Sequence, residues 1–206
     1  MGNSHGMTRS TSMLDAGQAL KDLTEPWSVT RGSAGAMAGC LAAPLIATVC
    51  FDHIEECRSA KGEEELRGIG DRALSIRRDL LALVEQLDKA SRAVREAERQ
   101  PDRLRALLFA SEVPLRTAES CHLLLNLSMK ALGRVGVKGL GEIGTAASLA
   151  FAGVVGGIVT ARAYLAGIPA GTGLGVGATR KRAERILREA EALRTQITDR
   201  VRQHLP

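Results

Sequence analysis

The sequence is poor in aromatic residues, which make up only 2% of the 206 residues: one Trp, one Tyr and three Phe. Large rings supply much of the core of many globular proteins, and they supply the stacking surfaces of proteins that bind single-stranded nucleic acid. Here the apolar content is mostly Ala, Leu, Val and Ile. Because Ala and Leu are strong helix formers and small side chains let helices approach closely, we expect an all-α protein.

Several signatures of other folds and of catalysis are also missing. No segment has the alternating pattern of a strand, and there is no nucleophile elbow, Ser/His/Asp signature or metal-binding box. The four cysteines form no CxxC pair and lie mostly in apolar helical context, so we interpret them as small buried side chains rather than zinc ligands. We therefore expect no metal and no cofactor. The cysteines are Cys40, Cys50, Cys57 and Cys121.

The formal net charge is +5, and most of it comes from residues 180–206, which hold eight Lys/Arg and four Asp/Glu. Nucleic-acid binding is one interpretation of this basic segment. However, the basic residues alternate with acidic ones and no aromatics accompany them, which is typical of a solvated helix face. We expect no nucleic-acid partner.

Two uncharged runs approach the length of a membrane span, 18 residues in Ala34–Phe51 and 17 in Thr145–Ala161. They are rich in Ala, Gly, Ser and Thr, which insert less well than Leu and Ile, and no aromatic belt flanks them. We predict buried central helices of a soluble bundle rather than membrane segments. The first ten residues are polar and no apolar secretory region follows them, so we expect a cytoplasmic protein.

Apolar periodicity predicts a helical bundle of about five long helices and one short helix. Residues 1–11 are expected to form a disordered tail, and residues 12–206 a single helical domain. The two apolar helices should be central and the amphipathic ones should wrap them. The expected helices span about 13–23, 33–59, 63–99, 101–134, 145–165 and 178–203.

Three charged residues stand beside apolar or kinked segments. Asp52 ends the first uncharged run, where it is either solvated or an acid/base group. Glu142 precedes the second run, where it either complements the helix dipole or is a buried carboxylate with a raised pKa. Arg116 follows Pro114, and it either pairs with Glu112 one turn earlier or binds an anion in the space that a kink opens.

Two further motifs favour plainer interpretations. GTGLGVG at 171–177 lacks the GK[ST] of a phosphate loop and follows a helix rather than a strand, so a flexible connection is favoured over anion binding. His122 lies on a helix beside Cys121 and Leu123, which is more typical of a core or boundary histidine than of a catalytic one.

Three short segments, in the same order, resemble the cyclodeaminase/cyclohydrolase family. This family includes the cyclodeaminase half of formiminotransferase-cyclodeaminase and bacterial methenyltetrahydrofolate cyclohydrolases. SVTRGSAGAMAG occupies the place of its SPTPGGGS-like turn, SEVPLRTAE carries its Val-Pro, and GEIGTAASLA resembles its SDxGxAA-like helix entry. The resemblance runs from about residue 14 to about residue 201.

The resemblance implies an all-helical dimer, homo- or heteromeric, that acts on a C–N bond of a one-carbon folate. It places part of a folate-binding cleft at the glycine-rich turn, where small residues let the backbone pack against a ligand or helix. For proton handling the expected groups are Glu142 and Asp52. The expected substrate-binding residues are Ser28, Thr30, Arg31, Gly32, Ser33 and Arg116.

The sequence also departs from the family pattern. Val29 and Arg31 replace both prolines of the turn, Gly141-Glu142 replaces the Ser-Asp pair, and the asparagines late in the apolar helix are Thr160 and Tyr164. Lost asparagines remove donor–acceptor pairs that a pterin edge would need. Two alternatives therefore remain. One is a recruited family member that closes or opens a different nitrogen ring. The other is a non-catalytic partner subunit of a related protein.

Overall fold

The computed structural model describes residues 33–57, 59–169, 172 and 175–204. Within these ranges the chain is helical and contains no strand, which confirms the all-α prediction. The tail expected at 1–11 and the short helix expected at 13–23 lie outside the described residues. The elements are α2 (Ser33–Asp52), α3 (Ala60–Glu96), α4 (Gln100–Leu132), the 3₁₀ turn η1 (Val137–Gly139), α5 (Leu140–Ala166) and α6 (Val176–His204).

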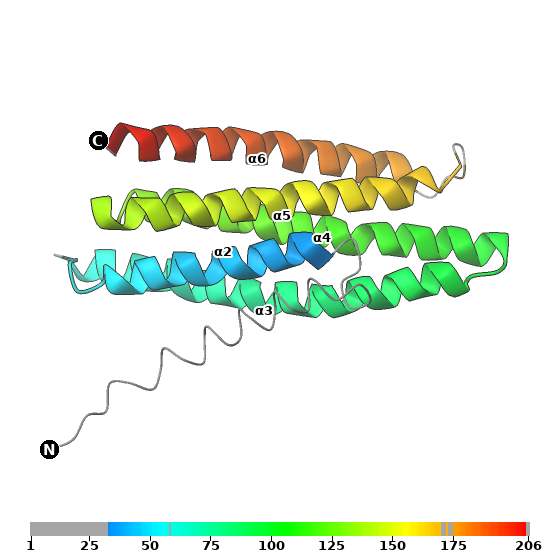
Figure 1. The fold of residues 1–206 in the computed structure, drawn as a ribbon, viewed down its shortest axis with the longest axis horizontal. Helices are drawn as coiled ribbons and strands as arrows, with labels where there is room; N and C mark the ends of the chain where they lie inside the picture. Colours follow the sequence, from blue (N-terminus) through cyan, green and yellow to red (C-terminus); the bar gives the residue numbers. More distant parts are fainter. Residues whose placement is uncertain (1–32, 58, 170–171, 173–174, 205–206) are drawn as a thin grey trace, which may run out of the picture.

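The five helices run up and down in an elongated bundle (Figure 1). The apolar helices α2 and α5 pack against one another and against α4, while α3 covers one side of this trio and α6 the other. Each of the two apolar helices contacts three others, whereas α4 contacts all four. The central helix is therefore α4, which differs from the sequence-based prediction that the two apolar helices are central.

The apolar helices are not covered all round. Ser33–Asp52 and the segment Val137–Ala166 are long and apolar enough to cross a membrane by length and composition, and only 56% and 44% of their apolar stretches are buried in the bundle. Each helix thus keeps one face that the described residues do not cover. These two faces are apolar surface that packing among the described helices leaves exposed.

The amphipathic helices bury the stripes that their spacing predicts. On α3 the residues at steps of three and four are buried against α2 and α4, from Leu66 to Leu87. On α6, Ala183, Ile186, Ala190 and Ile197 form the equivalent stripe. The charged faces of both helices remain outside, because a long polar side chain loses hydration when it is buried without a partner.

The connection between α2 and α3 differs from the sequence-based expectation. The helix predicted to reach about residue 59 ends at Asp52, and α3 begins at Ala60 rather than after Lys61-Gly62. The Ser59 side chain explains the new start, because its Oγ accepts a hydrogen bond from the Gly62 amide at 3.2 Å and caps α3. Gly62 therefore lies in a first helical turn and does not break the chain there.

Glycines set the distance between α2 and α5. A Cβ atom on Gly156 would lie 3.3 Å from the Cα of Gly35, and a Cβ on Gly153 would lie 2.8 Å from the Gly35 carbonyl oxygen. The backbones of the two helices are therefore in direct contact. Any larger side chain at Gly153 would force the helices apart, because neither backbone can yield as a flexible side chain can.

The same part of α5 contacts α4 at its proline. A Cβ on Gly157 would lie 2.5 Å from the Pro114 carbonyl oxygen and 2.9 Å from the Ala118 nitrogen. Cys121, one turn further along α4, fills the space beside Gly35 and Gly153, with its Sγ 3.9 Å from the Gly35 carbonyl oxygen. Three helices thus meet around residues without bulky side chains.

Three of the four thiols are buried, as predicted, and Cys57 is half-buried. Burial raises the pKa of Cys40 and of Cys50 to about 11, and that of Cys121 to about 12. A thiol with such a pKa stays protonated at neutral pH, so these cysteines act as small apolar side chains.

Replacing Gly157 by valine should destabilise the fold by about 3 kcal/mol or more, because the new Cβ meets backbone atoms of α4 that cannot move aside cheaply. Urea denaturation followed by circular dichroism measures this loss. Gly141→Ala is the matched control on the same helix, since a Cβ there meets nothing within 4 Å. The control should retain or exceed wild-type stability. Equal stability of the two variants would contradict the backbone contact.

Candidate functional site

The glycine-rich turn leads into the start of α2. Ser33, the first residue of that helix, is 4% exposed, and Gly35 two residues later touches α5. The small residues at this point therefore serve a close approach between helices. The other residues predicted for the cleft floor or for anion binding here lie outside the described residues: Ser28, Thr30, Arg31 and Gly32.

Arg116 lies on an exposed face of α4, and its Nη1 donates a hydrogen bond to Oε1 of Gln86 on α3 at 3.2 Å. The intrahelical pair with Glu112 that the spacing suggested is wrong. Glu112 instead binds Arg182 of α6, whose Nη1 lies 3.0 Å from the carboxylate. The reason is tertiary, since α6 brings a guanidinium to the side of α4 that carries Glu112.

Arg182 fastens α6 to α4. Its Nε and Nη2 donate hydrogen bonds to the two carboxylate oxygens of Glu119 at 2.6 Å each. Its Nη1 donates a hydrogen bond to the carboxylate of Glu112. The hydrogen bonds from Arg182 to Glu119 raise the pKa of the guanidinium, and the charges of both carboxylates add to this. Arg182, the second arginine of the basic RKR sequence after the glycine loop, is therefore engaged within the fold. It is not available as one of the cations that the anion-binding hypothesis for that loop would use.

The two carboxylates predicted to move protons lie at one end of the bundle, whereas Ser33, at the other end of α2, lies near the middle of α5. Asp52 is the last residue of α2, Glu142 lies in the first turn of α5, and both are exposed. These helix ends meet at Gly139, where a Cβ would lie 2.7 Å from Val49 and 3.0 Å from His53. The hypothesis that Glu142 is a buried carboxylate is wrong for the single chain, and its position fits the helix-dipole interpretation.

His53 is the buried polar group at this end. Its Nδ1 lies 2.8 Å from the Val49 carbonyl oxygen and so donates to it, which leaves Nε2 as the acceptor. That nitrogen is buried without a hydrogen-bond partner in the described part of the chain; the Glu56 carboxylate lies 4.0 Å from it. No group of three or more His, Cys, Asp or Glu residues among the described residues is placed to hold a metal ion.

The predicted site residues that the structure describes do not line one cleft within a single chain. Nineteen residues separate Ser33 from Asp52 along α2, which is roughly 28 Å at the rise of an α-helix. Asp52 and Glu142 share one end, Ser33 lies near the middle of α5, and Arg116 lies on the outside of α4. Their catalytic and binding roles stay predictions.

Thr160 and Tyr164 form hydrogen bonds within the chain. In the family pattern these two positions, late in the apolar helix, are asparagines. Thr160 donates from its hydroxyl to the Gly156 carbonyl at 2.8 Å. The Tyr164 hydroxyl lies 2.8 Å from Oγ of Ser91 and joins α5 to α3 by a hydrogen bond. Neither side chain offers the paired donor and acceptor of an amide, so this stretch of α5 is adapted to packing.

Comparison with known proteins identifies the family of this helical chain. A family model described as formiminotransferase-cyclodeaminase matches residues 30–169. The chain belongs to that family. The matched range of residues is shorter than the range of the resemblance seen in the sequence, and it excludes Ser28 and α6. It contains Ser33, Asp52, Arg116 and Glu142.

A solved structure supports the fold over a longer range. Formiminotetrahydrofolate cyclodeaminase from Thermotoga maritima is similar to this chain with a TM-score of 0.76, and the match covers 91% of this chain and 93% of that one. The identity is 20%, so this likeness is one of fold. The comparison with curated proteins gives no match.

Protonation of His122 should weaken the fold below neutral pH. Burial between α4 and α6 lowers the pKa of His122 below its ordinary value near 6.5, more than the nearby Glu189 carboxylate raises it. The unfolded chain then binds the proton more readily, so stability present above about pH 6.5 is lost as the pH falls toward the folded pKa.

Urea midpoints measured between pH 7.5 and 5.5 test this. His122→Gln should show a smaller loss on the acid side than the wild type. His204→Gln, at an exposed histidine in the last turn of α6, should keep the wild-type slope. The lowered pKa would be refuted if His122→Gln and the wild type lost stability in parallel.

Proposed function

We propose that this chain is an enzyme that acts on a C–N bond of a one-carbon folate, either formimino- or methenyl-tetrahydrofolate, or of a similar small nitrogen-ring substrate. The observation that carries this proposal is the family match over residues 30–169, which contains the glycine-rich helix start, Pro114 and the apolar helix α5. We also propose that it works in the cytoplasm.

The reaction needs few chemical groups. In ammonia loss, the second amine nitrogen of the folate, outside the pterin ring, attacks the formimino carbon and gives up its proton. The former imino nitrogen is protonated, its bond to that carbon breaks, and it leaves as ammonia, so that the carbon bridges two folate nitrogens. In hydrolysis, water adds to the one-carbon bridge and one C–N bond opens. Both routes need a base that removes a proton and an acid that returns it. Asp52 and Glu142 are proposed for these steps, and Arg31 and Arg116 for the substrate's anionic groups.

Asp52 and Glu142 lie at one end of the bundle and Arg116 lies on the outside of α4, so we propose that a second chain completes the site. The uncovered faces of α2 and α5 support this, since α2 carries no charged residue before Asp52 and α5 none between Glu142 and Arg162. On these faces Leu41 is 42% exposed and Val159 is 60% exposed. Contiguous uncharged surface of this kind is typical of protein–protein contacts.

The dispersal favours a second candidate function. Exposed carboxylates and an arginine spread over different parts of the surface suit a non-catalytic subunit that keeps the fold and binds a related partner. The recruited enzyme, with another nitrogen-ring substrate, differs from the main proposal only in the substrate. A test of turnover distinguishes the non-catalytic subunit from both enzymes. The choice of substrate then distinguishes the recruited enzyme from the folate enzyme.

The activity test uses purified full-length protein and the absorbance of methenyltetrahydrofolate. The proposal expects formation of this compound from the formimino substrate, or its hydrolysis, above the spontaneous rate. Asp52→Asn with Glu142→Gln should lower the rate at least tenfold. The matched control, Asp79→Asn with Glu85→Gln, removes two exposed carboxylates of α3 and should leave the rate unchanged. No turnover of either folate would refute the folate substrate.

Self-association is tested separately by sedimentation. The wild type should sediment as a dimer, and Leu41→Glu with Val159→Glu should shift it to monomer because a buried charge is costly at an interface. Leu81→Glu, at a residue that is 41% exposed on α3, is the control and should remain dimeric. A monomeric wild type would overturn the two-chain site.

A further inference from the structure

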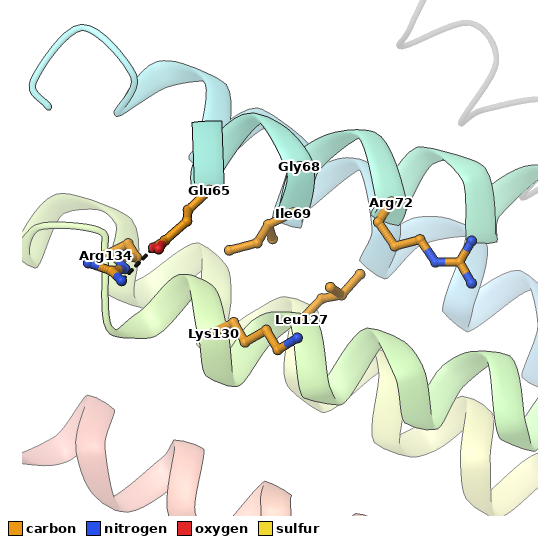
Figure 2. A pocket seen from close by; sticks show the side chains of 7 residues that line it. All are labelled: Glu65, Gly68, Ile69, Arg72, Leu127, Lys130 and Arg134. Atoms are coloured by element: carbon orange, nitrogen blue, oxygen red, sulfur yellow. Dashed lines mark ion pairs between the residues drawn. The ribbon is translucent and has the colours of Figure 1, made fainter. Parts of the chain in front are cut away.

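A groove lies between the first half of α3 and the second half of α4. Its volume is about 580 Å³. None of the residues predicted for the folate site lines it. The lining residues are Glu65, Gly68, Ile69, Arg72, Leu127, Lys130 and Arg134 (Figure 2).

The floor of the groove is apolar and partly open. Ile69 and Leu127 lie between the two helices (Figure 2), and each is 8% exposed. Gly68 borders the groove, and a Cβ at this position would meet nothing within 4 Å. The missing side chain therefore leaves room next to the two apolar residues. A flat ring or a short apolar body would fit against this floor.

The rim of the groove is mainly cationic. Arg134 forms an ion pair with Glu65 at one end, as Figure 2 shows. Arg72 and Lys130 lie further along the groove, and neither has an ion pair or a side-chain hydrogen bond within the described part of the chain. The lining thus contains three cations and one carboxylate, and two of the cations have no ion pair in the described part of the chain.

The spacing shows how the fold gathers these groups. Glu65, Gly68 and Arg72 recur at steps of three and four on α3. Leu127 and Lys130 are three residues apart on α4, and Arg134 lies in the turn just after that helix ends. The lining residues within each helix therefore occupy one face, and the antiparallel packing of α3 on α4 brings the two faces together.

A second surface hollow has a different lining. The hollow around the end of α3 and the start of α4 is lined by Glu96, Glu98 and Asp102 against Arg99, with only Ala93 and Ala97 as apolar residues. It has the opposite charge balance and no large apolar side chain. A third hollow, at the end of α6, combines apolar residues such as Leu132 and Leu140 with Arg200. The α3–α4 groove differs from it in having two cations, Arg72 and Lys130, without an ion pair in the described part of the chain.

We propose that this groove binds a small organic anion, in which a carboxylate or phosphate group is joined to an apolar body. The anionic group lies between Arg72 and Lys130, where the guanidinium donates paired hydrogen bonds and the ammonium supplies a point charge. The apolar body lies against Ile69 and Leu127. This binding does not depend on the proposed folate activity, because no residue is shared.

Isothermal titration calorimetry of the full chain at low ionic strength tests the proposal, with phenyl phosphate and benzoate as separate probes. At least one should bind with a Kd tighter than about 1 mM. The tighter of the two identifies the anionic group. Inorganic phosphate, which lacks the apolar body, should bind more weakly than phenyl phosphate.

Two variants localise the site. Arg72→Gln with Lys130→Gln should weaken binding at least tenfold, and Gly68→Leu should abolish it by filling the groove. The leucine also favours the helix, so Gly68→Leu should remain folded by circular dichroism. The matched control, Arg78→Gln with Lys89→Gln, removes two exposed cations of α3 that do not line the groove and should bind as the wild type does.

Three outcomes would overturn the proposal: no saturable binding of either organic anion, equal loss in the control and groove variants, or inorganic phosphate binding as tightly as phenyl phosphate. Because no folate is used, a failed activity assay has no bearing on this result.

Discussion

The bundle depends on a backbone-to-backbone contact between α2 and α5. Gly35 meets Gly153 and Gly156 so closely that a methyl group at Gly153 would overlap the carbonyl oxygen of Gly35. Gly157 repeats this contact with the Pro114 carbonyl of α4. Three helices are thereby held at a separation that leaves little space for aromatic rings. The scarcity of aromatics and the abundance of Ala and Gly in the sequence follow from the same constraint.

The close trio also determines what the other two helices do. Because α2 and α5 are narrow and apolar, α3 and α6 are needed to cover their flanks, and both supply a buried aliphatic stripe with a charged outer face. Specific polar contacts then fix their positions. Arg182 binds both Glu112 and Glu119 of α4, and the guanidinium of Arg194 lies 4.9 Å from the centre of the Phe151 ring on α5.

The candidate folate site has a different status from the fold. The family match and the structural likeness agree on the architecture. However, the residues proposed for chemistry are spread along the bundle, with Asp52 and Glu142 at one end and Ser33 near the glycine contacts. The faces of α2 and α5 that the described residues leave uncovered lie between these points, and the proposed second chain would cover them. The groove between α3 and α4 lies outside this arrangement and uses separate cations.

Much of the fold could be predicted from the sequence because it depends on local periodicity. The stripe from Leu66 to Leu87 and the apolar runs of α2 and α5 were sufficient to predict a helical bundle, although its central helix is α4. The boundary near Ser59 was missed because one side-chain cap, rather than composition, decides where α3 begins. Family membership was also recognisable, since short motifs in order survive where their surroundings change.

The partners of charged side chains were not predictable in the same way. Glu112 has Arg116 one turn away in sequence and yet binds Arg182, seventy residues later. Glu142 precedes an apolar helix and is nevertheless exposed, and Arg72 and Lys130 share a groove that neither helix reveals alone. The sequence by itself determined the helices, their apolar faces and the family, because these depend on residues close along the chain. Only the tertiary structure decided which charges meet, because that depends on the register between packed helices.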